Sequence, residues 1–231
     1  WVLARRLLKD KTLVGEFVQA SYRSSAAILG VAFIQNIYGT SGMAPLMILG
    51  SVPLFNIFAV IILTVESPQQ HGKVTPSKLL YGVLTNPILD GIILGTLYSL
   101  LAFGLPTLAQ KTLTSLSSLT TPLALLSIGA SFEGAKAIKK LAPTLVAACC
   151  KLMVLTTIFI PIAVKLGFRD QQLIALLIML GSPTTPSSYV MAKNMGHEGV
   201  LTASCVAATT LFSALSLTFW IFALRSGGYI A

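Results

Sequence analysis

The sequence predicts an all-α integral membrane protein, and three observations lead to this class. Of the 231 residues, 55% are hydrophobic and only 10% are charged, whereas a soluble domain carries about 25% charged residues. The mean hydropathy is +0.83. The apolar residues also fall in runs of about 20, the length that a helix needs to cross about 30 Å of hydrocarbon.

The net charge of +9 and the three cysteines do not alter this prediction. The basic residues lie in short loops between apolar runs, where they determine membrane topology, so we expect no nucleic-acid partner. Cys149 and Cys150 are neighbours in an apolar run and point about 100° apart on a helix, so they cannot by themselves hold a metal ion. We expect neither a metal site nor a cofactor.

An initial stub, residues 1–8, resembles the tail of a helix whose start is absent, so we expect an N-terminally truncated sequence. About seven apolar segments follow it. They are 17–38, 43–65, 87–106, 112–132, 141–165, 171–193 and 200–225. The sizeable polar linker is 66–86, in which 77–84 is amphipathic and suits a membrane surface.

The Lys and Arg residues predict the orientation, because cytoplasmic loops carry an excess of them. Alternation of the segments across the bilayer assigns 11 of the 16 to one side and 4 to the other, with Lys151 inside a span. The first group is Arg5, Arg6, Lys9, Lys11, Arg23, Lys73, Lys78, Lys136, Lys139, Lys140 and Lys193, and the second is Lys111, Lys165, Arg169 and Arg225. We therefore expect the linker to be cytoplasmic and the C-terminus to be outside.

Two segments contain polar interruptions. In 171–193 the run GSPTTPSSY (181–189) places two prolines and five Ser and Thr hydroxyls within the membrane. Proline breaks a helix, and irregular backbone at that depth is tolerated only inside the protein or beside a wet cavity. In 17–38 the interruptions are RSS (23–25) and QN (35–36).

The two interrupted segments also end alike. The first is followed by GTSG (39–42) and the second by GHEG (196–199), and each leads into a final helix of about 25 residues. An odd number of spans separates them, so the two units would be inverted repeats, which are typical of transporters. We divide the chain into the C-terminal part of a first repeat (1–65), a cytoplasmic linker (66–86) and a second repeat (87–231).

Five stretches, spread in order over essentially the whole chain, resemble the auxin efflux carrier family, which includes bacterial malate and malonate permeases. They are YRSSAAILG (22–30), PLFNIFAV (53–60), NPILDGIILG (86–95), PLALLSIGAS (122–131) and SPTTPSSYVMA (182–192). Two departures concern the first interruption: Ser25 stands where the family often has Asn, and Ala32 where many members have Pro. The substrate of any one member therefore cannot be carried over.

The resemblance implies a ten-helix fold of two inverted repeats, with two broken helices that cross at the substrate site. The chain would begin near the end of the third helix. A mobile domain would move against a scaffold of helices one, two, six and seven. The implied function is secondary transport of a small organic anion, such as a carboxylate or an auxin-like solute, across the cell membrane by alternating access.

Nine residues are candidates for substrate binding. They are Ser25, Asn56, Lys151, Ser182, Pro183, Thr184, Thr185, Pro186 and Ser187. The hydroxyls beside the prolines either line the site or only satisfy the broken helix. Lys151 lies mid-span, where a charge is costly and faces the bundle interior; it suits a carboxylate substrate, ion coupling or structural pairing. Asn56 and Asn36 are polar groups that need partners.

Two further charged residues have competing explanations. Arg23 lies nearer a helix end, where anchoring to lipid phosphates explains it as well as a role in the site does. Asp90 follows Pro87 in the first turn of a helix, where a carboxylate interacts favourably with the helix dipole.

Two other functions are alternatives to the transport of an organic anion. A carrier like the bile-acid/sodium symporters needs a sodium site of carboxylates and carbonyls, and only Asp90 is a carboxylate near the membrane. GTSG (39–42) matches the G-x-S-G of rhomboid-type proteases, but their serine needs a nearby base, and His71 and His197 are placed in loops. We predict no enzyme. The expected partners are the organic anion and the lipid bilayer, with a homodimer as one option; the coupling ion, a proton or sodium, is left open.

Overall fold

The computed structural model describes residues 1–40, 42–68, 75–101 and 104–230, where the regular structure is helical. The first half contains α1 (Val2–Leu7), a 3₁₀ turn (Lys11–Leu13), α2 (Val14–Tyr22), α3 (Ala26–Tyr38), α4 (Ala44–Val65), α5 (Pro76–Leu84) and α6 (Pro87–Leu100). The second half contains α7 (Thr107–Ala130), α8 (Gly134–Lys139), α9 (Leu141–Cys149), a π-helical turn (Cys150–Val154), α10 (Leu155–Lys165), α11 (Asp170–Gly181), α12 (Ser187–Asn194) and α13 (Val200–Ser226).

Four of the described helices are long and apolar enough to cross a membrane. They are α4, α7, the continuous helix Leu141–Lys165 formed by α9, the π-helical turn and α10, and α13. They coincide with four predicted segments, although α7 begins at Thr107 and not at residue 112. The predicted segment 87–106 is too long, since α6 ends at Leu100. Gly104 and Pro106 disfavour a helix over the last residues of that predicted segment.

The predicted segments 17–38 and 171–193 each form two helices separated by extended backbone, which confirms both breaks. α2 is followed by Arg23 (ψ 125°), and α11 is followed by Ser182 (ψ 158°). The second interruption predicted within 17–38 is wrong. Gln35 and Asn36 lie inside α3, where Asn36 donates a hydrogen bond to the carbonyl of Ala32 four residues earlier (2.8 Å).

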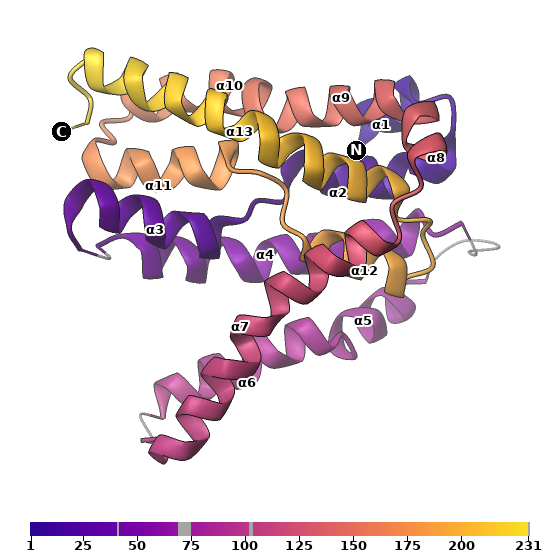
Figure 1. The fold of residues 1–231 in the computed structure, drawn as a ribbon, viewed down its shortest axis with the longest axis horizontal. Coiled ribbons are helices and arrows are strands. Elements are labelled where there is room, and N and C mark those ends of the chain that lie inside the picture. Colours follow the sequence, from indigo (N-terminus) through magenta and orange to yellow (C-terminus); the bar gives the residue numbers. More distant parts are fainter. Residues whose placement is uncertain (41, 69–74, 102–103, 231) are drawn as a thin grey trace.

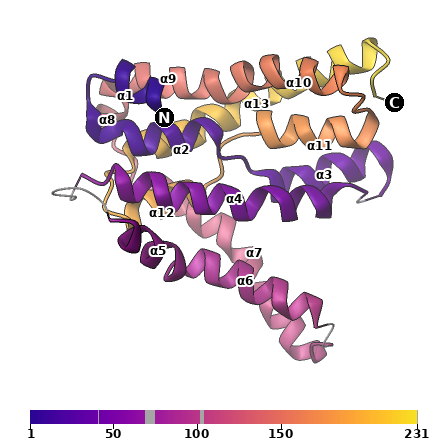
Figure 2. The ribbon, with the colours of Figure 1, turned by 180° about the vertical axis from the view of Figure 1, so that it is seen from behind.

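The two broken helices lie side by side in opposite directions. Figures 1 and 2 show α3 beside α11, with the end of α3 and the start of α11 at the same end of the molecule. Gly39, Gly42, Gly196 and Gly199 all have positive φ, between 38° and 81°, a conformation that glycine adopts without strain. The paired glycine turns after each broken helix are therefore confirmed, although Ser41 lies outside the described residues. The ten-helix arrangement and the division at 66–86 stay predictions.

The helices form a layered bundle from which one hairpin projects. In Figure 1, α10 and α13 lie above α2 and α11, which lie above α3 and α4. The main core contains Ile34, Met47, Ile160 and Leu177 from four different helices. The α6–α7 hairpin leaves this bundle (Figure 2), and only 6% of the most apolar part of α7 is buried. Much of the hairpin is therefore apolar surface of the kind that lipid covers.

Charged side chains gather at one end of the bundle. Arg5 bonds to Glu66, and Lys140 bonds to Glu198 beside the start of α13. The C-terminus lies at the opposite end, where the guanidinium of Arg169 lies 5.1 Å from the ring of Tyr229 (Figure 1). Arg5 and Lys140 of the first predicted group thus lie at one end, and Arg169 of the second group lies at the other. The face that meets the cytoplasm stays a prediction.

A buried carboxylate joins α2 to α13. Glu16 is 1% exposed, and its two oxygens accept hydrogen bonds from the N–H groups of Gly199 and Thr202 and from the Thr202 hydroxyl, all at 2.9 Å. Glu16 thus caps the N-terminus of α13 from another helix, where a negative charge also favours the helix dipole.

We expect Glu16→Ala to lower the free energy of unfolding by about 3 kcal/mol, because it removes a charged cap and leaves buried donors unsatisfied. Thermal or denaturant unfolding in detergent measures the loss. Glu133→Ala is the matched control, since Glu133 is exposed and, among the described residues, forms an ion pair only with Lys136; it should cost less than about 1 kcal/mol. Equal losses in the two variants would contradict this role.

The contact between Glu198 and Lys140 predicts a weak dependence of stability on pH. The hydrogen bond from Lys140, followed by the charges of Lys140 and Lys136, lowers the pKa of the Glu198 carboxyl. A lowered pKa stabilises the fold fully above the ordinary carboxyl value of about 4.3, and this stabilisation is lost as pH falls through the lowered value.

Because the Glu198 side chain is 43% exposed, Glu198→Gln should cost only about 0.2–1 kcal/mol at neutral pH. The difference between the variant and the parent should shrink as the pH is lowered below about 4. Unfolding temperatures measured across a pH series test this. A difference that stays constant or grows in acid would rule the contact out.

Candidate functional site

The two helix breaks bond directly to each other. The N–H of Ser25 donates to the carbonyl of Pro183 (2.9 Å), and the hydroxyl of Thr184 donates to the carbonyl of Ala20 (2.9 Å). The N–H of Thr184 donates to the hydroxyl of Thr209 on α13 (3.0 Å). Unwound backbone inside a membrane must find such partners, because no lipid group can supply them. The breaks therefore form one crossover.

A fully buried lysine lies behind the crossover. The ammonium of Lys151 donates to the carbonyls of Leu180 (2.8 Å) and Tyr22 (3.2 Å), lies 3.5 Å from that of Met179, and bonds to the hydroxyl of Ser24. These carbonyls belong to the last turns of α11 and α2, where carbonyls lack helical partners and the dipole is negative. Lys151 is 0% exposed and lies in the π-helical turn.

A pocket of about 230 Å³ lies in front of the crossover, between α3, α4 and the start of α12. Its lining residues are Arg23, Ser24, Ser25, Ala27, Val52, Phe55, Asn56, Ile92, Thr185 and Ser187. The guanidinium of Arg23 donates to the side-chain carbonyl of Asn56 (2.6 Å) and to the hydroxyl of Ser187 (3.1 Å). Arg23 is only 3% exposed.

The pocket favours a negative charge. Within the described ranges, Arg23 forms no ion pair with a carboxylate. The pocket also lies at the start of α3, through Ser25 and Ala27, and at the start of α12, through Ser187. Helix N-termini carry partial positive charge, and half-helices in transporters point them at anionic groups. A buried guanidinium and two N-termini therefore converge on one cavity.

The predicted site residues divide into two groups. Ser25, Asn56, Thr185 and Ser187 line the pocket together. Pro186 lines an adjoining cavity of about 590 Å³ that includes Thr185 and Ser187 and reaches α7. Figure 1 shows α12 crossing α7 at this place.

The other four residues lie within the crossover and do not line the pocket. The carbonyl of Pro183 accepts the N–H of Ser25. Thr184 is 1% exposed, and it donates through its hydroxyl to Ala20 and through its N–H to the hydroxyl of Thr209. Ser182 is 0% exposed, and its hydroxyl has no hydrogen-bond partner in the part of the chain described. Lys151 supports the crossover from behind.

Arg23 is the pocket residue that the sequence analysis left out of the site. Its burial excludes the alternative of anchoring to lipid phosphates, and it does not belong to the charged end of the bundle. One signal could have identified it: the chain has only seven Asp and Glu, and none lies in the apolar runs beside Arg23. A cation in an interrupted span without an available carboxylate suggests a ligand of opposite charge.

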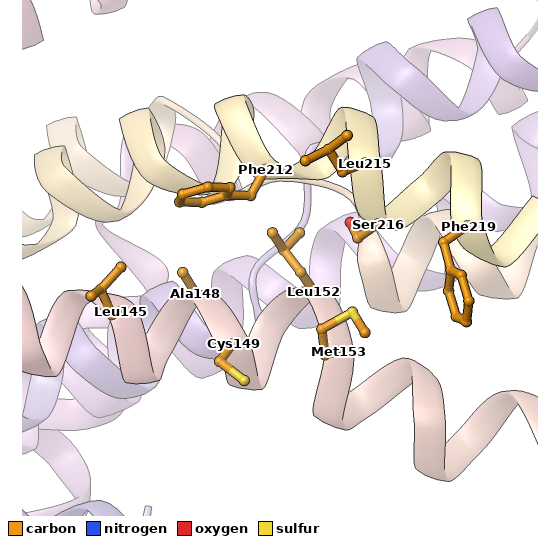
Figure 3. A pocket seen from close by; sticks show the side chains of 9 residues that line it. All are labelled: Leu145, Ala148, Cys149, Leu152, Met153, Phe212, Leu215, Ser216 and Phe219. Carbon is orange, nitrogen blue, oxygen red and sulfur yellow. The ribbon is translucent and has the colours of Figure 1, made fainter.

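A larger cavity lies on another face and has different chemistry. Figure 3 shows this pocket, of about 410 Å³, between α13 and the helix that contains the π-helical turn. Eight of its nine lining residues are apolar or Cys, and the hydroxyl of Ser216 donates to the carbonyl of Ser213 (3.3 Å). Nothing in its lining selects an anion. Among the described residues, no group of three or more His, Cys, Asp or Glu could hold a metal ion.

Comparison with known proteins agrees with the resemblance in the sequence. The model of a family described as membrane transport protein, which is the family of the auxin efflux carriers, matches residues 1–221. The chain belongs to this family. Neither the curated proteins nor the solved structures provide a match.

Membership of the membrane transport protein family decides the broad function. The protein is a membrane transporter, and its four long apolar helices agree with a location in a membrane. The family is one of transporters and not of enzymes.

Thr184 and Thr185 are neighbours with different expected roles. Thr184→Val should lower the free energy of unfolding by about 1–3 kcal/mol, because it leaves the buried carbonyl of Ala20 without its partner. Thr185→Val should cost less than about 1 kcal/mol, because that hydroxyl faces the pocket and Ser187. Unfolding of the two variants in detergent tests the assignment. A larger loss for Thr185→Val would reverse it.

Proposed function

We propose that this transporter carries a small organic anion by alternating access, with the crossover pocket as the binding site. The observation that carries the proposal is the buried guanidinium of Arg23, which lines the pocket and has no carboxylate partner in the described ranges. A buried cation costs several kcal/mol unless it is paired. A bound anion removes that cost each time the site is filled.

The chemistry of the lining suits a carboxylate. A guanidinium presents a planar fork of N–H donors that binds two carboxylate oxygens at once. The hydroxyls of Ser25, Thr185 and Ser187 add donors around it. At about 230 Å³ the pocket is smaller than the roughly 300–1,000 Å³ of sites for drug-sized ligands, which favours a small solute.

The neighbouring cavity supports alternating access. Thr185 and Ser187 line both the crossover pocket and the cavity beside α7, so the same hydroxyls border two separate spaces. The hairpin of α6 and α7 is anchored to the bundle at one end, through Leu89 and Ile128. Relative motion of hairpin and bundle would widen one space at the expense of the other. In this proposal the linker 66–86 is cytoplasmic and the C-terminus is outside.

The test is flux through the full-length gene product in proteoliposomes, with labelled malate, malonate and indole acetate. Arg23→Gln should lower the uptake of the transported anion by about 10–100-fold, the effect of removing a charged hydrogen-bond donor. Arg23→Lys should retain part of the activity, because an ammonium keeps the charge but cannot reach Asn56 and Ser187 as a fork.

Arg6→Gln is the matched control, since Arg6 is exposed near the N-terminus, and its flux should equal that of the parent. Equal flux in Arg23→Gln and the parent would show that this pocket is not the anion-binding site. Transport of a neutral solute or a cation in place of all three anions would overturn the substrate class.

A further inference from the structure

Lys151 is a buried cation that the proposed binding site does not use. Its side chain is 0% exposed and absent from the lining of the crossover pocket. In the described ranges no carboxylate forms an ion pair with it. Its partners are four oxygens, three from carbonyls and one from the Ser24 hydroxyl. The charge must therefore be stabilised by dipoles alone.

The helix ends that supply these oxygens indicate which ligand they could bind in place of the ammonium group. Tyr22 ends α2, and Met179 and Leu180 lie in the last turn of α11, so two half-helices point their negative ends at one position. Such half-helix ends and unwound carbonyls coordinate sodium ions in transporters that couple transport to sodium. Ser24 adds a hydroxyl and donates in turn to the carbonyl of Met179. The set consists of hard oxygen donors and suits a small monovalent cation.

The ammonium of Lys151 occupies the position where such a cation would sit. The hydrogen bonds of the π-helical turn each span one residue more than those of an α-helix, and this turn places Lys151 against the crossover. On the same turn, Leu152 and Met153 line the apolar pocket on another face (Figure 3). The lysine is tethered by its own backbone, so this cation cannot leave when the carrier changes state.

We propose that Lys151 is a resident cation that replaces a coupling sodium ion at the crossover. The two half-helix ends are then compensated by a cation tethered to the protein, and anion transport does not require sodium. Removal of the amine uncovers a latent site for a monovalent cation. This inference rests on the proposed carrier function, which it deepens.

The experiment measures the unfolding temperature of the full-length protein in sodium chloride and in choline chloride at equal ionic strength. The parent should unfold at the same temperature in both salts. Lys151→Ala should unfold at least about 5 °C lower in choline, because buried carbonyls lose their cation, and sodium should restore part of that loss. Anion flux through the parent should be equal in the two salts.

Two control variants separate the cation site from general damage. Lys151→Met fills the space of the side chain, so it should be destabilised without a response to sodium. Lys165→Ala removes an exposed lysine at the end of α10 and should behave as the parent does. If Lys151→Ala is difficult to purify, its recovery in sodium should exceed its recovery in choline.

A sodium-specific rise in the unfolding temperature of the parent, or parent flux that requires sodium, would overturn the inference. So would a Lys151→Ala protein that responds equally to both salts or is recovered in neither. The unfolding measurements need no transported solute, so they test Lys151 even if none of the labelled anions moves. Sodium-dependent malate flux would overturn this inference and leave the proposed function intact.

Discussion

The need to satisfy backbone hydrogen bonds without water is the constraint on which this structure depends. A continuous helix pairs its backbone N–H and C=O groups with one another, and each break in a helix leaves some of these groups without a helical partner. The breaks after Tyr22 and Gly181 meet the constraint together, since Ser25 bonds to Pro183 and Thr184 bonds to Ala20. Neither break could exist alone at this depth. The crossover is therefore a single unit built from two distant parts of the chain.

The crossover has a negative side and a positive side, because every break creates one helix C-terminus and one helix N-terminus. The C-terminal carbonyls of α2 and α11 face Lys151, which compensates their negative ends. The N-terminal ends of α3 and α12 face the pocket, where Arg23 adds further positive charge. The protein thus compensates the charge of Lys151, whereas Arg23 faces the pocket without a carboxylate partner in the described ranges. In the proposed function, this asymmetry would place the binding site for an anion directly beside a charge-balanced support.

The sequence predicted features that follow from local chemistry. Long apolar runs, a proline pair and glycine turns each determine the conformation of the backbone around them. The four long helices, both breaks and the glycines at positive φ could therefore be predicted. Three of the nine candidate residues, Ser25, Thr185 and Ser187, line the pocket for the same reason, since hydroxyls beside an unwound backbone gather there. Asn56 lines it from within α4.

The remaining features depend on which distant segments meet. Lys151 and Arg23 are both mid-bundle cations, and only their surroundings decide that one supports the backbone and the other faces the cavity. The π-helical turn that positions Lys151 has no local sequence rule that would place it at Cys150–Val154. Likewise, nothing in the sequence around Glu16 indicates that it caps α13, because this role depends on the N-terminus of α13 lying beside it.

The hairpin of α6 and α7 is joined to the pocket through α12. Its contacts with the bundle lie at one end, where Ile128 packs with Tyr189 of α12, and the hydroxyl of Tyr189 bonds to that of Ser131 just after α7. α12 is the second half of a broken helix, and its first residue, Ser187, bonds to Arg23. In the proposed transport cycle, a shift of the hairpin would therefore reach the guanidinium through one short helix. In the proposed transport cycle, the carbonyl contacts of Lys151 on the far side of the crossover would hold while the pocket side rearranges.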